Sequence, residues 1–411
     1  MKMERFIKKK KNNLIFSKIK FFIPYLFVFL LPTQLGRHFF FSFSYLNGLR
    51  VDYLAPTIYL IDIVFILMIF FNLNLFFSFL KEKKIIFFFL ILSLNLFFSQ
   101  LKPITFYSIL KVFQFLFVFY FFYKTKIDYF FVLISFLSIT IIELFLALYQ
   151  LNFGKSFDGI FYFLGERHFN LSTPGIAKIS FFGKEILRPY GTFSHPNSLA
   201  GFYLLFYTFI LSTKNFSQFF LLKNLCLFLS SFLIFFSFSK VAIFAFLMVN
   251  FFYFLKIKKD CLLCFFAKVV SFFILSLIFF IPAGDRLSFL KRIELLNQSL
   301  KIIVKSPFFG VGLGAYVYSQ SKFVSFYPLF FNQPVHNIFL LLASEIGLPF
   351  FLGLAFFLFN FFKKNYKKKS NTFYYLIIAI FFTGFFDHYW LTLKQNFLVL
   401  AFIFAETLKR S

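Results

Sequence analysis

Cysteine, tryptophan and acidic residues are all scarce in this chain. It has three cysteines, one tryptophan, and 15 Asp and Glu residues against 43 Lys and Arg residues. So few cysteines exclude a disulfide framework. The Cys261-x-x-Cys264 pair has no second pair and no histidine near it, so we interpret it as packing residues rather than a metal or redox site. Charged residues make up 14% of the chain, against about 25% in a typical soluble domain.

Apolar residues are correspondingly abundant. They make up 60% of the 411 residues, and phenylalanine alone contributes 85. Mean hydropathy is +0.83. A water-soluble core cannot bury this much apolar surface, so lipid must solvate much of it. We therefore expect an all-α polytopic membrane protein forming one integral membrane domain over residues 1–411, with the phenylalanines as lipid-facing and packing residues.

The formal charge of +28 would suggest a nucleic-acid partner in a soluble protein. Here the position of the charge matters more than its sum, and we expect no nucleic acid. Lysine clusters stop alternate apolar blocks, as the positive-inside rule requires of cytoplasmic segments. The basic start MKMERFIKKKKNN is interpreted as an uncleaved anchor. The predicted protein is multi-pass in the cytoplasmic (inner) membrane, with both termini cytoplasmic.

About twelve blocks are long enough, or nearly so, to cross the hydrocarbon layer as helices. One boundary, between the seventh and eighth, depends on the polar break at Ser237, Ser239 and Lys240. Without this break, every later segment would change sides of the membrane. The predicted spans are 19–33, 56–80, 85–100, 104–123, 128–150, 198–213, 222–238, 241–255, 261–283, 338–361, 372–388 and 395–408.

Two long loops then fall on the extracytoplasmic side, near 151–197 and 284–337. The second begins with RLSFLKRIELLNQSLKIIVKSP. Its apolar residues at 287, 290, 293, 296, 300 and 303 recur at steps of three or four, which predicts an amphipathic helix on the membrane surface. Pro307 is expected to end this helix.

Basic groups and histidines gather on this predicted outer face. They are Arg188, His195, Lys240, Arg286, Arg292, His336 and His388, together with Asp387. Polar groups next to membrane spans are costly unless they are paired or hydrated. Several cations on one face favour an anionic ligand, and a lipid-linked phosphate or diphosphate fits because guanidinium groups bind such oxygens in pairs.

Two further features accompany this group. The string GVGLGAY (Gly310, Gly312, Gly314) does not lie in a strand–turn–helix unit, so nucleotide binding is rejected. Its glycines either let a turn pack closely on helices or leave room for a substrate. Glu345 lies inside the predicted span 338–361, where a carboxylate is expected to pair with a cation or to hydrogen-bond within the bundle.

Four strings resemble the O-antigen ligase and O-antigen polymerase superfamily of membrane glycosyltransferases. They are R-x-x-G-T-F-x-H-P-N at 188–197, Ser239-Lys240 before a span, an R-x-x-x-L helix leading to SPFFGVGLGAY at 292–316, and HN-x-x-L-x-x-x-x-E-x-G at 336–347. DHYW at 387–390 is a weaker match. Together they cover roughly residues 185 to 395.

The resemblance implies a type C glycosyltransferase-like helical bundle with its active face extracytoplasmic. It implies metal-independent transfer of a glycan from a polyprenyl (undecaprenyl) diphosphate to a lipid, protein or cell-wall acceptor in cell-envelope polysaccharide biosynthesis, with no cofactor. Arg188, Lys240 and Arg292 would hold the diphosphate, with Arg286 as a further candidate. His336 would orient or deprotonate the acceptor hydroxyl, and Asp387 would support the site.

Two alternatives remain open from the sequence. In the first, the acceptor is a second lipid-linked repeat, which would make the protein a polysaccharide polymerase. A membrane transporter or flippase is the alternative from another class. It is disfavoured because the spans lack paired broken helices in matching halves, and because the polar groups gather on one face rather than at the midplane.

Overall fold

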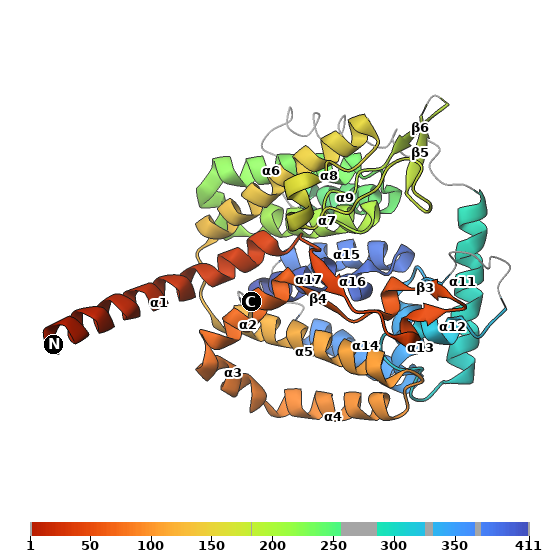
Figure 1. The fold of residues 1–411 in the computed structure, drawn as a ribbon, viewed down its shortest axis with the longest axis horizontal. Coiled ribbons are helices and arrows are strands. Elements are labelled where there is room, and N and C mark those ends of the chain that lie inside the picture. Colours follow the sequence, from red (N-terminus) through yellow and green to blue (C-terminus); the bar gives the residue numbers. More distant parts are fainter. Residues whose placement is uncertain (1, 182, 256–285, 325–331, 366–370, 410–411) are drawn as a thin grey trace.

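The computed structural model describes residues 2–181, 183–255, 286–324, 332–365 and 371–409, and this part is mainly helical (Figure 1). The helices of the first half are α1 (Lys2–Leu30), α2 (Leu60–Phe70), α3 (Leu73–Leu80), α4 (Lys83–Phe97), α5 (Lys102–Lys124), α6 (Tyr129–Phe153), α7 (Pro196–Ser212), α8 (Phe220–Phe236) and α9 (Lys240–Leu255). Those of the second half are α11 (Arg286–Lys305), α12 (Tyr316–Gln320), α13 (Ile338–Ile346), α14 (Leu348–Asn365), α15 (Asn371–Phe386), α16 (Tyr389–Thr392) and α17 (Lys394–Leu408).

A helix occupies each predicted span that the structure describes, whereas the span predicted at 261–283 lies outside the described residues, as does the Cys261-x-x-Cys264 pair. The polar break before Lys240 is confirmed, because α8 ends at Phe236 and α9 begins at Lys240. Phe238, between them, has a positive φ of 51°, which ends one helix before the next begins.

Fewer described helices than the predicted twelve are long and apolar enough to cross a membrane. In the described ranges, three helices are long and apolar enough to cross a membrane: α5, α6, and α8 with the turn before it, Lys214–Phe236. The α2–α3 pair would be a fourth if counted as one span, although it bends by 93°. The structure is consistent with a helical membrane protein, but twelve spans are not confirmed.

Two predicted spans are broken into shorter helices, which corrects the prediction. The block 56–80 divides into α2 and α3 at Phe71 and Asn72. The block 338–361 divides into α13 and α14 at Gly347, whose φ is +82°. A β-carbon on Gly347 would clash with the Phe308 carbonyl, so the close approach of that turn and the positive φ both favour glycine here.

The chain is also not purely α-helical. Three antiparallel pairs of short strands lie in the loops: β1 (Gly36–His38) with β4 (Thr57–Tyr59), β2 (Tyr45–Leu46) with β3 (Leu49–Arg50), and β5 (Lys178–Phe181) with β6 (Lys184–Leu187). Short 3-10 turns at Ser42–Ser44, Asp52–Leu54, Gly159–Leu164 and Lys214–Phe219 complete the described elements.

Helix α7 forms the centre of the core. Almost every side chain from Pro196 to Leu211 is buried. Phe206 stacks on Phe136 of α6 at 3.8 Å between ring centroids, and it also contacts Phe402 of α17. Phe356 of α14, by contrast, is 69% exposed. The phenylalanines therefore serve both expected roles, in packing and on the outer surface of the bundle.

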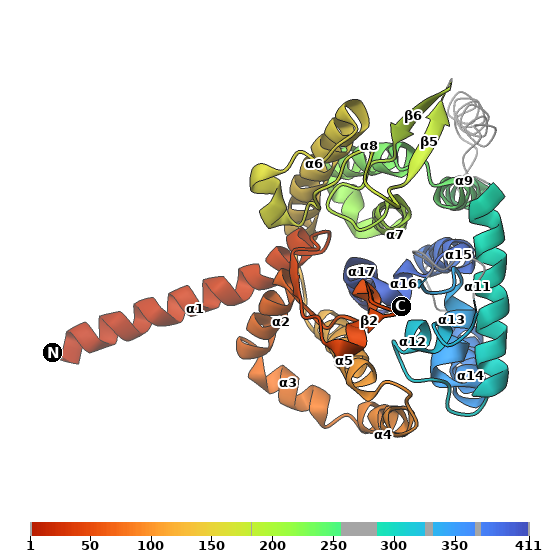
Figure 2. The same cartoon turned by 45° about the vertical axis from the view of Figure 1, so that its right-hand side comes forward.

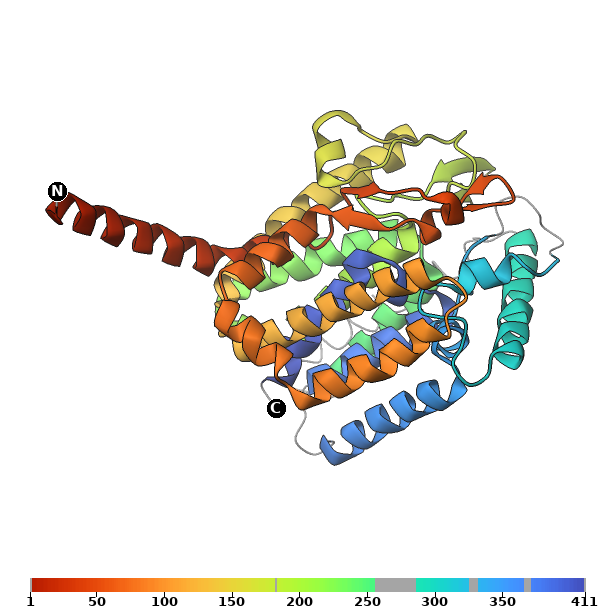
Figure 3. The ribbon, with the colours of Figure 1, turned by 60° about the horizontal axis from the view of Figure 1, so that its bottom comes forward.

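The loops gather at one end of the bundle. Figure 2 shows α15, α16 and α17 between the α6–α9 group and the α2–α5 group. Helix α11 runs steeply across the bundle end, near α12, α13 and the strand pairs, whereas α4, α5 and α14 run lengthwise (Figures 1 and 3). The helix predicted at 287–303 is therefore confirmed, and it ends at Lys305, two residues before Pro307. The candidate site lies at this end.

Candidate active site

Arg188 is held in place by two hydrogen bonds in different directions. Its Nε donates to the Ser237 carbonyl at 2.9 Å, and its Nη2 donates to Asn197 Oδ1 at 2.6 Å. Burial lowers the pKa of Arg188 to about 10, with the Arg292 charge acting in the same direction and Asp387 opposing it. The guanidinium therefore remains charged at neutral pH, in a fixed orientation.

Two side chains of α6 fix the turn that follows Arg188. Gln150 Oε1 accepts from the backbone N–H groups of Tyr190 and Gly191, both at 2.8 Å, and Gln150 Nε2 donates to the Gly191 carbonyl. The Glu143 carboxylate accepts from the Thr192 backbone N–H at 3.0 Å and from the Thr192 hydroxyl. A β-carbon at Gly191 would clash with Glu143, so this turn requires glycine.

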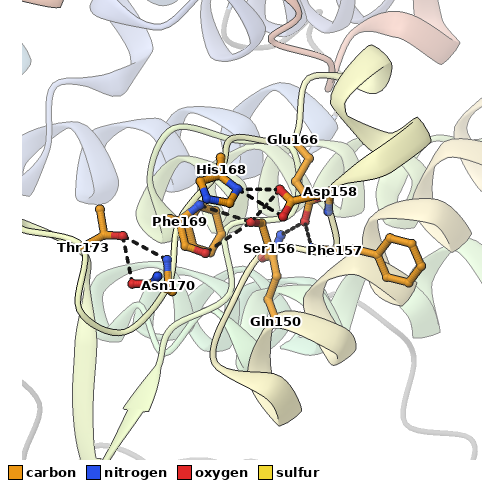
Figure 4. A network of polar contacts seen from close by, with 9 residues as sticks. All are labelled: Gln150, Ser156, Phe157, Asp158, Glu166, His168, Phe169, Asn170 and Thr173. Atoms are coloured by element: carbon orange, nitrogen blue, oxygen red, sulfur yellow. Dashed lines mark hydrogen bonds and ion pairs between the residues drawn. The ribbon is translucent and has the colours of Figure 1, made fainter.

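The same Gln150 also joins the turn to the preceding loop (Figure 4). Its Nε2 donates to Glu166 at 2.9 Å, and Glu166 accepts the backbone N–H groups of Phe157 and Asp158, both at 2.8 Å. The neighbouring His168–Asp158 pair is on the surface, with His168 81% exposed. The buried part of this network is a scaffold that positions residues 188–197 rather than a site of its own.

Asp387 is contacted by two segments that are distant from it in the sequence and by the backbone of its neighbour, His388. Asn197 Nδ2 donates to its Oδ2 at 2.8 Å, and the His388 backbone N–H donates to its Oδ1 at 2.8 Å. His336 Nδ1 lies 3.5 Å from Oδ1, within ion-pair range but not aligned as a hydrogen bond. Burial alone would raise the pKa of Asp387, but the His336 contact and the nearby histidines hold it well below its usual range. The carboxylate is therefore ionised.

His388, which follows Asp387, is buried and neutral. The His388 ring lies 5.0 Å from the His336 ring, and its Nδ1 bonds with the Thr392 hydroxyl at 2.8 Å. Burial lowers the pKa of His388 to about 3. Burial and the charge of Arg188 lower the pKa of His195 to about 3 as well.

His195 has a structural role that the sequence did not predict. Its Nδ1 accepts from the Asn197 backbone N–H at 3.1 Å and caps α7, and Pro196 is the first helical residue. Asn and Ser are preferred cap residues, so the string HPNS by itself predicts the cap at Asn197 or Ser198; that prediction is wrong, because His195 is the cap. Because the imidazole accepts the capping bond, the Asn197 side chain is free of that role and instead bridges Arg188 and Asp387.

A small cavity of about 20 Å³ lies between these groups. Arg292 lines it from α11, together with Asn197, Ser239, Val241, Thr383, Phe386, Asp387 and Tyr389. The volume holds about one water molecule. A diphosphate would therefore enter only if lining side chains move apart.

The structure brings together most of the predicted site residues. Arg188, Arg292, His336 and Asp387 meet around Asn197 and the cavity. Lys240 is half-buried at the first position of α9, between two residues that line the cavity. Arg286 begins α11, but its side chain lies outside the described residues.

The glycine string packs closely on its neighbours instead of opening a space. A β-carbon at Gly312 would clash with the Ser99 hydroxyl, and one at Gly314 would clash with that of Ser108. Asn95 of α4 donates to the carbonyls of Phe309 and Glu345 at 2.8 and 2.9 Å. Of the two sequence interpretations, the closely packed turn is thus the one that the structure shows.

Glu345 is buried against the same turn. Its carboxylate faces the backbone N–H groups of Gly314 and Tyr316, and Lys111 is a nearby cation. The expectation that Glu345 bonds within the bundle is confirmed.

Among the residues that the structure describes, one group of side chains could hold a metal ion. Potential ligand atoms of His336, Asp387 and His388 all lie within 4.8 Å of one another. Two imidazoles and a carboxylate are a common donor set for zinc and for related divalent ions. The absence of a metal from the reaction is implied by the family resemblance alone and stays a prediction.

Three functional residues were missed at the sequence level. By its residue type Asn197 is predicted only as a helix cap, whereas its amide bridges Arg188 and Asp387. Glu143 and Gln150 lie seven residues apart, so they share one face of α6. Two polar residues on one face of an otherwise apolar span are the signal that would have identified them.

The family model described as O-antigen ligase matches residues 225–358, about a third of the chain. The matched range contains Ser239-Lys240, α11, the glycine string and the HN-x-x-L-x-x-x-x-E-x-G string, whereas 188–197 and 387–390 lie outside it. No curated protein matches the chain significantly. The match supports the resemblance drawn from the sequence strings, and this part of the chain is similar to the O-antigen ligase family.

Proposed function

We propose that the protein transfers a glycan from a polyprenyl diphosphate carrier to an acceptor hydroxyl on the outer face of the cytoplasmic membrane. One observation carries the proposal: Arg188 and Arg292, from segments about a hundred residues apart, converge on Asn197 and Asp387 beside His336. Two fixed cations with an imidazole suit a reaction that releases a diphosphate and requires a base.

The proposed reaction is a direct displacement at the anomeric carbon. The acceptor oxygen forms the new bond to that carbon, the bond from the carbon to the diphosphate oxygen breaks, and the configuration inverts. Negative charge grows on the departing diphosphate, where Arg188 and Arg292 stabilise it, with Lys240 and Arg286 as further cations.

His336 takes the acceptor proton in this scheme. Its Nδ1 faces the ionised Asp387, so Nε2 is left to act as the base. Asp387 in turn orients the imidazole and favours the imidazolium that forms. None of these steps requires a metal or another cofactor, and the acceptor is a lipid, a protein or the cell wall.

The test is a transfer assay on purified protein with a lipid-linked oligosaccharide and an acceptor. We expect Arg292→Ala and His336→Ala each to lower turnover by about a thousandfold, since each removes charge stabilisation or the base. Arg50→Ala is the matched control, because Arg50 lies in an outer loop with its side chain 60% exposed. Turnover that survives both site substitutions would refute the proposal.

The assay also separates a ligase from a polymerase. Incubation with the lipid-linked oligosaccharide alone leaves a ligase without an acceptor, so we expect no product. A ladder of longer glycans would instead assign the polymerase reaction to the same site.

A further inference from the structure

Helix α11 has a buried side that faces the rest of the protein. Leu295, Gln298, Ser299 and Ile302 are all at most 3% exposed. The Tyr316 hydroxyl of α12 donates to the Leu295 carbonyl at 3.2 Å, and Gln320 Nε2 donates to Gln298 Oε1 at 3.0 Å. These contacts fix the rotation of α11 about its axis.

That rotation leaves an apolar stripe facing outward. The stripe consists of Phe289, Ile293, Leu296, Leu300 and Val304, which we call the outer stripe. Its members recur at steps of four, three, four and four residues, so they form one continuous row along the helix. They are between 41% and 78% exposed. In a membrane protein, a row of five large exposed apolar side chains is covered by apolar chains, either of the bilayer or of a bound lipid.

Arg292 lies at the boundary between the outer stripe and the buried side. At about 100° per residue, Arg292 points about 100° away from Ile293 in one direction around the helix. It points about 60° away from Leu295 in the other direction. It lines the cavity with Asn197 and Asp387, whereas Ile293 and Leu296 face away from the protein. One helix thus presents a cation to the site and an apolar row that starts beside this cation.

We propose that the outer stripe binds the isoprenoid tail of the donor, so that the diphosphate enters the cavity from the side while its tail lies along α11. The proposal rests on the proposed function, because it assigns the tail of that same donor. An anionic headgroup with a long apolar chain matches a cation followed by an apolar row.

The dimensions of the outer stripe favour a single chain over a second protein. From Ile293 to Val304 the row is about 16 Å long, at 1.5 Å per residue. It is one side chain wide, and Glu294 and Lys301 lie on the neighbouring face of the helix. A stable interface between two copies needs about 800 Å² from each partner, which a row of this width does not supply.

The test compares donors that differ only in their tail, with the same glycan on undecaprenyl or on farnesyl diphosphate. In Leu296→Gln/Leu300→Gln, we expect the KM for the undecaprenyl donor to rise about tenfold, because the tail loses apolar contact with two stripe positions. The kcat and the KM for the shorter donor should not change. The matched control is Leu352→Gln on α14, where the leucine is 59% exposed.

Three outcomes would overturn the assignment of the tail. They are an unchanged KM for the long donor, an equal rise for both donors, and a change of oligomeric state without a change of either KM. Val304→Gln, at the most exposed position of the stripe, repeats the test if the double variant does not insert into the membrane.

A binding measurement separates this proposal from the proposed function. Undecaprenyl diphosphate with a diazirine in its tail should label residues 289–304 of the wild-type protein on irradiation. Labelling elsewhere in the chain, with none in this range, would overturn the tail assignment even if transfer occurs. Labelling of this range by a protein that transfers no glycan would keep the tail assignment while the transfer proposal fails.

Discussion

The two arginines of the site are held in opposite ways. Arg188 belongs to a turn that α6 fixes through Glu143 and Gln150, and its guanidinium makes two hydrogen bonds. Arg292 belongs to α11, which crosses the end of the bundle and exposes an apolar row, and no hydrogen bond to its guanidinium is found in the described part of the chain. The difference indicates that Arg188 is preorganised by its hydrogen bonds, whereas Arg292 is on the side of the site that the ligand approaches.

Replacing each arginine by lysine tests this difference most strongly. Arg188→Lys keeps the charge but loses the fork that reaches Ser237 and Asn197, so we expect kcat to fall about a hundredfold. Arg292→Lys should cost only about tenfold, because its charge matters more than a fixed orientation. Transfer rates of the two variants provide the measurement, and equal losses would remove the contrast.

The scaffold under Arg188 provides the second test. Gln150→Leu leaves the backbone N–H groups of Tyr190 and Gly191 without their acceptor, at a cost of about 1–3 kcal/mol each. We expect a lower apparent Tm and a fall in kcat of about tenfold in the protein that remains folded.

The control for this test is Gln114→Leu, which removes a buried amide that donates to Asp62 on α2. It should lower the apparent Tm and leave kcat unchanged. If both variants lose kcat equally, the scaffold does not position Arg188.

Acid should destabilise the part of the site around Arg188 and Asp387, because His195 and His388 are neutral there. The pKa values of His195 and His388 are lowered to about 3, so in the unfolded chain these residues bind protons that the native state excludes. Their stabilisation is complete above pH 6.5 and is lost as the pH falls. At pH 5, each costs roughly 2 kcal/mol of stability. The apparent Tm should therefore drop between pH 7 and pH 5, and less so in His388→Gln; a Tm that does not change with pH would contradict the assignment.

Lys240 offers a smaller effect. The resemblance to the O-antigen ligase superfamily implies an arginine at this position, and Lys240→Arg would place a guanidinium fork next to Ser239, which lines the cavity. We expect turnover to rise by about two- to threefold, because the diphosphate gains one more paired contact. A loss of activity would indicate that the site is shaped around lysine.

Chelation should have no effect at all. Although His336, Asp387 and His388 could bind a metal, the proposed reaction uses them as a base and its supports. EDTA should leave the transfer rate unchanged. A loss that zinc or magnesium restores would turn this group into a metal centre.

The sequence predicts the helices well because their causes are local. Apolar blocks bounded by lysines became helices, and the polar residues before Lys240 marked a true break. The break at Gly347 was missed because it depends on a contact with another segment, since the turn packs on the carbonyl of Phe308. Composition does not report such contacts.

The sequence predicts the charged residues of the site better than the residues that hold them in place. Arg188, Arg292 and His336 lie in strings that resemble a family, and the structure brings them to one place. The role of Asn197 could not be deduced, because it depends on His195 taking over the cap of α7. Which of two adjacent polar residues caps a helix is decided by the fold around them.

The most direct test of the account is whether the two arginines bind one diphosphate. Binding of undecaprenyl diphosphate should be measured for the wild-type protein, Arg188→Ala, Arg292→Ala and His336→Ala. We expect both arginine variants to bind about ten- to a hundredfold more weakly, since each loses charge-assisted hydrogen bonds, while His336→Ala binds like the wild type. Wild-type affinity in both arginine variants would contradict the shared site.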